Sequence, residues 1–238
     1  MFSRLQENRI YIISEIHPQF GGHMGTAEQM ILHSKLAGAD AVKVQLYRSE
    51  LFGDSLREYV TIDFDELSKL KSYSDSIGIE FFASIFHADL VEWGEKLNFN
   101  YYKVASRSVD DRELCEAMIA TGKPVIISLG MYDLEKELPY VSDNVSYLYC
   151  VSNYPTILED VHLPQKFPYK GMIGYSDHTI GTSTVFLALA RGARIIEKHF
   201  TLSKSNQITT ELGHLGGMTP EELSDIRIFA DDVVRLRS

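Results

Sequence analysis

The chain has 238 residues, which suits one large domain or two small ones, and its apolar content is ample for a core. Its 23 basic and 33 acidic residues give a net charge of −10, which argues against a general nucleic-acid binder. The start is polar, and no apolar run approaches the length of a membrane span, so we expect a cytoplasmic protein without a membrane partner. The cysteines Cys115 and Cys150 lack metal-site spacing and fit a reducing compartment.

Eight apolar runs of strand length recur along the chain, and most are continuously apolar, which is typical of strands buried on both faces. They span 11–16, 41–47, 80–86, 101–106, 124–130, 145–151, 172–178 and 194–200. Helical patterns occupy 26–36, 65–76, 90–97, 111–120, 185–192 and 219–237. The last of these begins with a capping box that includes Thr219 and Glu222, and residues 181–183 are able to cap the helix before it. The connection 154–171 contains three prolines and is the least regular.

This alternation predicts an α/β fold, a single (β/α)8 TIM barrel that occupies residues 1–238 as one domain. A doubly wound open sheet is the alternative, but it would usually carry a Gly-rich phosphate-binding fingerprint after the first strand, and none is present. In a barrel the active site lies at the C-terminal ends of the strands. Polar residues at these ends are therefore the candidates for function.

The stretch 174–200 has a strand–helix–strand pattern with polar residues at both strand ends. Ser176 and His178 share one face of the first strand, and Glu197 and His199 share one face of the second. If the strands are parallel neighbours, the two imidazoles converge and are able to hold a divalent metal with open positions. The alternative is that both are hydrogen-bonded structural residues. Lys198 should point away from the barrel interior, and no role is assigned to it.

Charged residues also interrupt the other buried strands: Glu15, Lys43 with Gln45 on the same face, and Lys103. A lone buried lysine is costly, so two of them indicate either a bound dianion, such as a phosphate or carboxylate, or internal pairing with Glu15 and Glu197. Hydroxyls at or near strand ends resemble a phosphate cradle. They belong to Ser84, Ser106, Ser128, Ser152 and Ser176.

Taken together, these residues resemble the N-acetylneuraminate (sialic acid) synthases and their relatives for other nonulosonic acids. The resemblance covers nearly the whole chain through the blocks IISEI, AGADAVKVQ, YYKVAS, TGKPVIISLGM, YCVSNYPT, GYSDHTIG and GARIIEKHFTL. It implies a transferase that condenses phosphoenolpyruvate with a 2-acetamido sugar, N-acetylmannosamine or a related hexosamine. It also implies a divalent cofactor, Mn²⁺ in the first place, with Mg²⁺ or Co²⁺ as alternatives.

The resemblance assigns roles to particular positions. His178 and His199 would bind the metal, and Glu15 would act as acid and base near the reacting carbon. Glu15, Lys43, Lys103 and Glu197 form the implied catalytic set. Phosphoenolpyruvate would be held by Lys43, Gln45, Ser84, Lys103, Ser106, Ser128, Ser152 and Ser176. The sugar would contact Glu15, Tyr154, Glu197 and Glu211.

Three departures from the family pattern concern the sugar end of the pocket. The loop after the first strand reads Gln19-Phe20-Gly21-Gly22 instead of Asn-His-Asn-Gly, and Gly213 stands where the sugar-binding Asp belongs, with Glu211 as the nearest acid. Relatives also carry a C-terminal antifreeze-like domain that lends an Arg to the partner's site, and the chain shows no such segment. We therefore expect near-normal phosphoenolpyruvate binding with weak or altered sugar selectivity. Either a separate antifreeze-like domain protein supplies the Arg, or the natural acceptor differs from N-acetylmannosamine. A homodimer is expected as a further partnership.

Two other functions remain open from the sequence. A Schiff-base barrel aldolase would use Lys103 or Lys43 as the amine, but it would give no role to His178 and His199 at the strand ends. A catalytically weak paralogue that binds a sugar would account for Gly213. The retained lysines, serines and histidines argue for the synthase.

Overall fold

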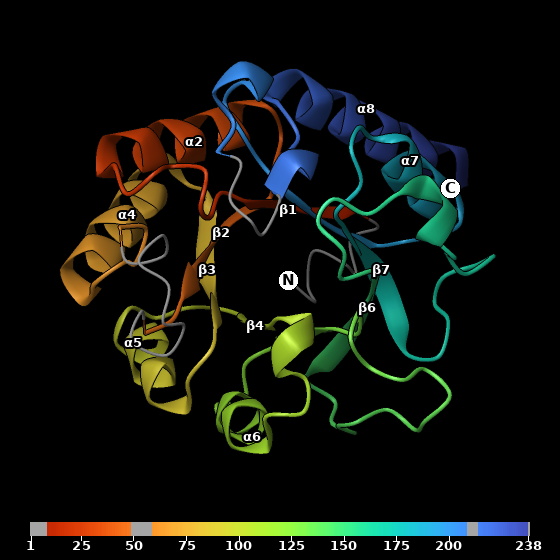
Figure 1. The fold of residues 1–238 in the computed structure, drawn as a ribbon, viewed down its shortest axis with the longest axis horizontal. Helices are drawn as coiled ribbons and strands as arrows, with labels where there is room; N and C mark the ends of the chain where they lie inside the picture. The colour runs from red at the N-terminus through yellow and green to blue at the C-terminus, as the bar shows by residue number, and fades with distance from the viewer. Residues whose placement is uncertain (1–8, 49–58, 209–213, 238) are drawn as a thin grey trace.

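The computed structural model of the chain describes residues 9–48, 59–208 and 214–237. Eight parallel strands pair in chain order, and the last pairs with the first, so the sheet closes into a barrel (Figure 1). They are β1 (Tyr11–Glu15), β2 (Ala41–Leu46), β3 (Glu80–Ile85), β4 (Tyr102–Val104), β5 (Val125–Ser128), β6 (Val145–Cys150), β7 (Met172–Asp177) and β8 (Ile195–His199). Each strand lies within one of the eight apolar runs, so the predicted barrel is confirmed.

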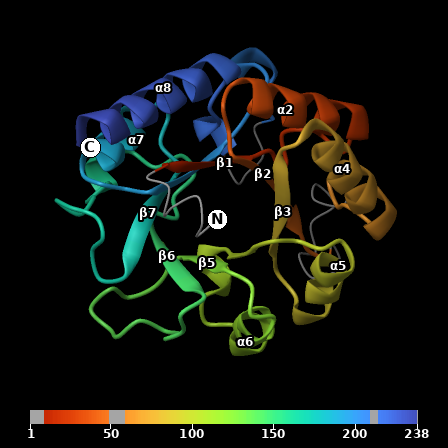
Figure 2. The ribbon, with the colours of Figure 1, turned by 180° about the vertical axis from the view of Figure 1, so that it is seen from behind.

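The helices lie outside the ring of strands, as the views from both ends show (Figures 1 and 2). They are α2 (Met24–Leu36), α4 (Phe64–Ile77), α5 (Val91–Lys96), α6 (Arg112–Ala120), α7 (Ser183–Ala190) and α8 (Pro220–Arg237). All six coincide with helical patterns of the sequence to within a few residues at each end. Since each helix covers the outer face of the barrel, the strands are buried on both sides and their runs are apolar throughout.

Two connections depart from a regular (β/α)8 pattern. Between β5 and β6, residues 129–144 form turns instead of an α-helix, and residues 151–171 between β6 and β7 contain only a short 3-10 helix, η4 (Leu158–Asp160). Pro155, Pro164 and Pro168 explain the second case, because proline lacks the amide donor and keeps the preceding residue out of the helical region. Neither connection contains one of the helical patterns of the sequence, and the second is the one predicted to be the least regular.

Helix ends follow local chemistry where the sequence supplies it. At α8 the Thr219 amide donates to Glu222 Oε2 at 2.8 Å, and the Glu222 amide donates to Thr219 Oγ1 at 3.3 Å, which confirms the predicted capping box. The start of α7 differs from the prediction, because Thr182 makes no side-chain cap. Thr184 instead turns its hydroxyl toward the sheet, where Asp177 Oδ1 accepts from it at 3.1 Å.

The register of the strands brings polar residues to one end of the barrel. Glu15 of β1 lies beside Lys43 of β2 on one side and beside His199 of β8 on the other. Ser176 of β7 lies beside Glu197 of β8. Glu15, Ser176 and His199 stand at or next to the C-terminal ends of their strands, and Lys43 and Glu197 lie slightly deeper. We call this end of the barrel the rim. No helix in the described part of the chain is long and apolar enough to cross a membrane.

Candidate active site

Four charged side chains from strands β1, β2, β4 and β8 meet in the rim. Lys43 Nζ donates to Ser84 Oγ at 2.7 Å, forms a salt bridge with Glu15 Oε2 and lies 3.7 Å from Glu197 Oε2. On the opposite side, Lys103 Nζ lies 3.7 Å from Glu197 Oε1. All four side chains are less than one-tenth exposed. The internal pairing that the sequence left as an alternative is therefore present, with Glu197 shared between the two lysines.

Each lysine is also held by a serine hydroxyl. Besides the bond to Ser84, Lys103 Nζ donates to Ser128 Oγ and to the Val104 carbonyl, both at 2.8 Å. Ser176 Oγ donates to Glu197 Oε1 at 2.8 Å. These bonds fix the two ammonium groups and the carboxylate in place before any ligand arrives.

The surroundings push the pKa values of these groups in different directions. Burial raises the pKa of Glu15, and the Lys43 ammonium offsets only part of that effect. Burial disfavours the charged form of Lys43, but Glu15 and Glu197 outweigh it and raise the pKa of Lys43. For Lys103 burial outweighs the attraction of Glu197 and lowers the pKa. Burial also opposes the charge on Glu197, but Lys103 and Lys43 lower its pKa. Glu15 is therefore the carboxyl best able to hold a proton, whereas Glu197 stays ionised.

Glu197 has one unmet requirement. Its Oε2 is buried and has no hydrogen-bond partner among the described residues, although the Lys43 ammonium lies 3.7 Å away. A buried carboxylate oxygen without a donor is costly. Because Glu197 lines the cavity of the rim, a ligand hydroxyl or amide placed there would satisfy it.

The cavity at the rim has a volume of about 50 Å³. Among the predicted site residues in the described part of the chain, only Ser152 is missing from its wall. The lining includes Glu15, Lys43, Gln45, Ser84, Lys103, Ser106, Ser128, Tyr154, Ser176, His178, Glu197 and His199. Ser152 lies beside Gly130, where a Cβ on the glycine would meet Ser152 Oγ at 2.4 Å. Glu211 and Gly213 lie outside the described residues.

The imidazoles of His178 and His199 face each other, with ring centroids 5.7 Å apart. His178 Nδ1 lies 2.9 Å from the Val151 carbonyl, and His199 Nδ1 lies 3.1 Å from the His17 carbonyl. A carbonyl only accepts, so each Nδ1 carries the hydrogen and the lone pair is on Nε2. A hydrogen bond from one ring nitrogen to a carbonyl, with the other nitrogen left for the ion, is the usual arrangement of a metal-binding histidine.

The described residues contain no group of three or more His, Cys, Asp and Glu side chains arranged to hold a metal ion. An ion held by these two imidazoles would therefore take its other ligands from water and substrate. The Tyr154 ring covers them from one side, with its centroid 4.2 Å from that of His178 and 6.5 Å from that of His199. Tyr154 itself remains 38% exposed, at the mouth of the cavity.

Sequence reasoning missed two residues of the rim. His17 links two of the predicted residues, because its amide donates to Glu15 Oε1 at 2.8 Å and its carbonyl accepts from His199. Cys150 lines the cavity, with its sulfur 3.7 Å from His178 Nδ1. The position of His17, shortly after the end of β1, was a signal that could have identified it. Cys150 gave a weaker signal: it ends β6, but a thiol is less conspicuous there than a charged side chain or a hydroxyl.

Comparison with known proteins places this geometry in context. The sequence profile of the NeuB family matches residues 53–233. An N,N'-diacetyllegionaminic acid synthase of Legionella pneumophila is 30% identical over 91% of this chain and 70% of its own length. An uncharacterised protein of Methanocaldococcus jannaschii is 34% identical over 91% of this chain and 68% of its own. The crystal structure of an N-acetylneuraminic acid synthetase from Leptospira borgpetersenii, 28% identical, superposes with a TM-score of 0.84 over 97% of this chain and 85% of that one.

Proposed function

The chain belongs to the NeuB family, and from this premise we propose that it condenses phosphoenolpyruvate with the open-chain aldehyde of a 2-acetamido sugar. N-acetylmannosamine or a related hexosamine is the acceptor, and the products are a nonulosonic acid and phosphate. One observation carries this proposal: two buried lysines, each bound to a serine hydroxyl, flank a shared carboxylate beneath two facing imidazoles. Relatives named as synthases of such acids support it.

The charges of the rim suit phosphoenolpyruvate. Its carboxylate and phosphate are placed against Lys43 and Lys103, which are fixed beforehand by Ser84 and Ser128. The cavity of about 50 Å³ is smaller than usual ligand pockets of several hundred Å³, so it takes the charged groups and leaves the sugar above the strand ends. There the sugar lies next to Tyr154, and one of its hydroxyls donates to the unsatisfied Glu197 Oε2.

The reaction joins C3 of phosphoenolpyruvate to the aldehyde carbon, adds the oxygen of water to C2 and breaks the bond between C2 and the phosphate oxygen. The aldehyde oxygen gains a proton, and Glu15, whose pKa is raised by burial, is the group placed to transfer it. The lysines stabilise the charge on the departing phosphate. A divalent ion bound by His178 and His199, Mn²⁺ with Mg²⁺ or Co²⁺ as alternatives, would polarise the aldehyde and orient the water.

Release of phosphate from phosphoenolpyruvate, measured with Mn²⁺ and a panel of 2-acetamido sugars, tests the proposal. We expect phosphate release that requires both the metal and one of the sugars, with one keto acid formed for each phosphate. Phosphate release at the same rate without any sugar, or none with the whole panel, would contradict it.

A Schiff-base aldolase is the second candidate, and the lowered pKa of the buried Lys103 favours it. Against it, Lys103 Nζ makes two hydrogen bonds and lies near Glu197, which hold it as a cation. Treatment with pyruvate and borohydride separates the two candidates. A covalent adduct on Lys103 would establish the aldolase, and the synthase predicts no adduct.

A further inference from the structure

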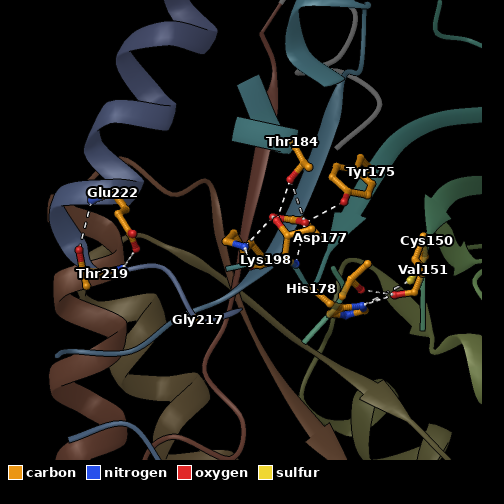
Figure 3. Close-up of polar contacts among 12 residues, drawn as sticks. Cys150, Val151, Tyr175, Asp177, His178, Thr184, Lys198, Gly217, Thr219 and Glu222 are labelled. Carbon is orange, nitrogen blue, oxygen red and sulfur yellow. Dashed lines mark hydrogen bonds and ion pairs between the residues drawn. The ribbon is translucent and has the colours of Figure 1, made fainter. Parts of the chain in front are cut away.

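A buried ion pair stands directly behind the two imidazoles of the rim. Asp177 and Lys198 are paired across β7 and β8, and Lys198 Nζ lies 2.5 Å from Asp177 Oδ2 with both side chains fully buried (Figure 3). Asp177 immediately precedes His178 in the chain, and Lys198 immediately precedes His199. Because side chains alternate along a strand, the two side chains lie on the face opposite to Ser176 and Glu197, although both residues also border the cavity.

The same pair also holds the residue after His178. Lys198 Nζ donates to the Thr179 carbonyl at 2.7 Å, and Asp177 Oδ1 accepts from the Thr179 amide at 3.0 Å. His178 is thus bracketed by two residues that are both tied to Lys198. Since His199 is the next residue after Lys198, the single lysine connects the backbone positions of both imidazoles.

Other groups fix the carboxylate itself. The Tyr175 hydroxyl donates to Asp177 Oδ1 at 2.7 Å, and the hydroxyl of Thr184 on α7 donates at 3.1 Å (Figure 3). A buried ion pair is weak as a source of stability, since apolar side chains of similar volume fill such a space at no electrostatic cost. The pair instead fixes the relative position of the ends of β7 and β8, because its hydrogen bonds are all satisfied in one arrangement of those strand ends only.

We propose that Asp177 and Lys198 are positioning residues for the metal site, which set the spacing and orientation of His178 and His199 from behind the sheet. This inference rests on the proposed function, because it requires that the two histidines bind a metal ion. Among the described residues the pair bonds to neither Lys43 nor Lys103, so its loss should affect the metal end of the rim more than the phosphate end.

Two variants of the full chain test this. The double variant Asp177→Asn with Lys198→Met removes both charges at nearly constant volume and avoids leaving one ion buried alone. Asp177→Asn by itself keeps an acceptor for the Thr179 amide but leaves the Lys198 ammonium buried without its carboxylate, so it is the harsher change. Mn²⁺ binding is followed by the electron paramagnetic resonance signal of free Mn²⁺, and binding of phosphoenolpyruvate without metal is followed by calorimetry. Circular dichroism and urea unfolding establish that each variant is folded.

Loss of groups that orient metal ligands typically weakens metal binding about 10- to 100-fold, and we expect at least about tenfold for the double variant, with phosphoenolpyruvate affinity unchanged. Thr184→Val is the matched control: it removes a bond to the same carboxylate without breaking the link between the strands, so its Mn²⁺ affinity should equal that of the wild type. Wild-type Mn²⁺ affinity in both folded test variants would overturn the inference, and so would an equal loss of Mn²⁺ and phosphoenolpyruvate binding. Failure of the wild type to bind Mn²⁺ would overturn the proposed metal site, and the inference with it.

Discussion

Replacement of Lys103 by methionine separates the binding of phosphoenolpyruvate from the stability of the barrel. The change removes one ammonium group that lies 3.7 Å from Glu197 and bonds to Ser128 and the Val104 carbonyl. Burial already lowers the pKa of Lys103, so its charge is held at a cost in the folded state. An apolar side chain of similar length removes that cost but leaves the buried Glu197 with Lys43 as its remaining cation, so the free energy of unfolding should change little or fall.

The effect on ligand binding should be large and is measured separately from the effect on stability. A hydrogen bond to a charged group contributes about 1.5–3 kcal/mol, and about 1.4 kcal/mol corresponds to a factor of ten in affinity. Lys103→Met should therefore weaken phosphoenolpyruvate binding roughly 10- to 150-fold. Calorimetric titration with phosphoenolpyruvate gives the affinity, and urea unfolding gives the stability.

A lysine at the other end of the barrel provides the control. Lys123 precedes β5, and its Nζ lies 2.7 Å from Glu95 Oε1 in a partly exposed ion pair. Lys123→Met makes the same chemical change there, and it should leave phosphoenolpyruvate affinity at the wild-type value because surface ion pairs contribute little. Equal affinities of Lys103→Met and the wild type for phosphoenolpyruvate would refute the assignment of the rim as its binding site.

Three further outcomes are expected. His199→Ala should abolish turnover and weaken Mn²⁺ binding while leaving the far-ultraviolet circular dichroism spectrum unchanged, and full metal content with full activity would contradict the assignment. Glu15→Gln keeps an acceptor for the His17 amide but cannot carry the proton, so kcat should fall about 100-fold or more, with phosphoenolpyruvate affinity retained. Lys198 lowers the pKa of Asp177 below its unfolded value in spite of burial, so the carboxylate stabilises the fold above about pH 4 and this contribution is lost as the pH falls further. Urea unfolding between neutral and acid pH should show a steeper loss for the wild type than for Asp177→Asn, and identical slopes would refute this.

The barrel and most of its rim follow from local sequence patterns. Continuous apolar runs predict strands that are covered on both faces, and the period of two puts Glu197 and His199 on the inner face at the same strand end. A charge inside such a run, such as Lys43 or Lys103, is conspicuous because burial without a partner is costly. These features were accessible because each depends on residues within one strand or two neighbouring ones.

Other features depend on how distant segments meet, and the sequence did not predict them. Ser152 has the same residue type as the cavity serines, but it lies past the end of β6, beside Gly130, and does not line the cavity. The bond from His199 to the His17 carbonyl joins residues at opposite ends of the chain. Lys198 borders the cavity although its side chain bonds to Asp177 and Thr179, and its pairing with Asp177 needs the register of β7 against β8, which only the closed barrel defines.

The position of bond cleavage in phosphoenolpyruvate tests the proposed reaction most directly. With ¹⁸O in the oxygen that bridges C2 and phosphorus, the chain, Mn²⁺ and the active 2-acetamido sugar should release phosphate that retains the label, because the C2–O bond breaks. ³¹P nuclear magnetic resonance resolves labelled from unlabelled phosphate. Sugar-dependent phosphate that carries the bridging ¹⁸O is the predicted result. Unlabelled phosphate, which reports cleavage of the P–O bond, would contradict the account.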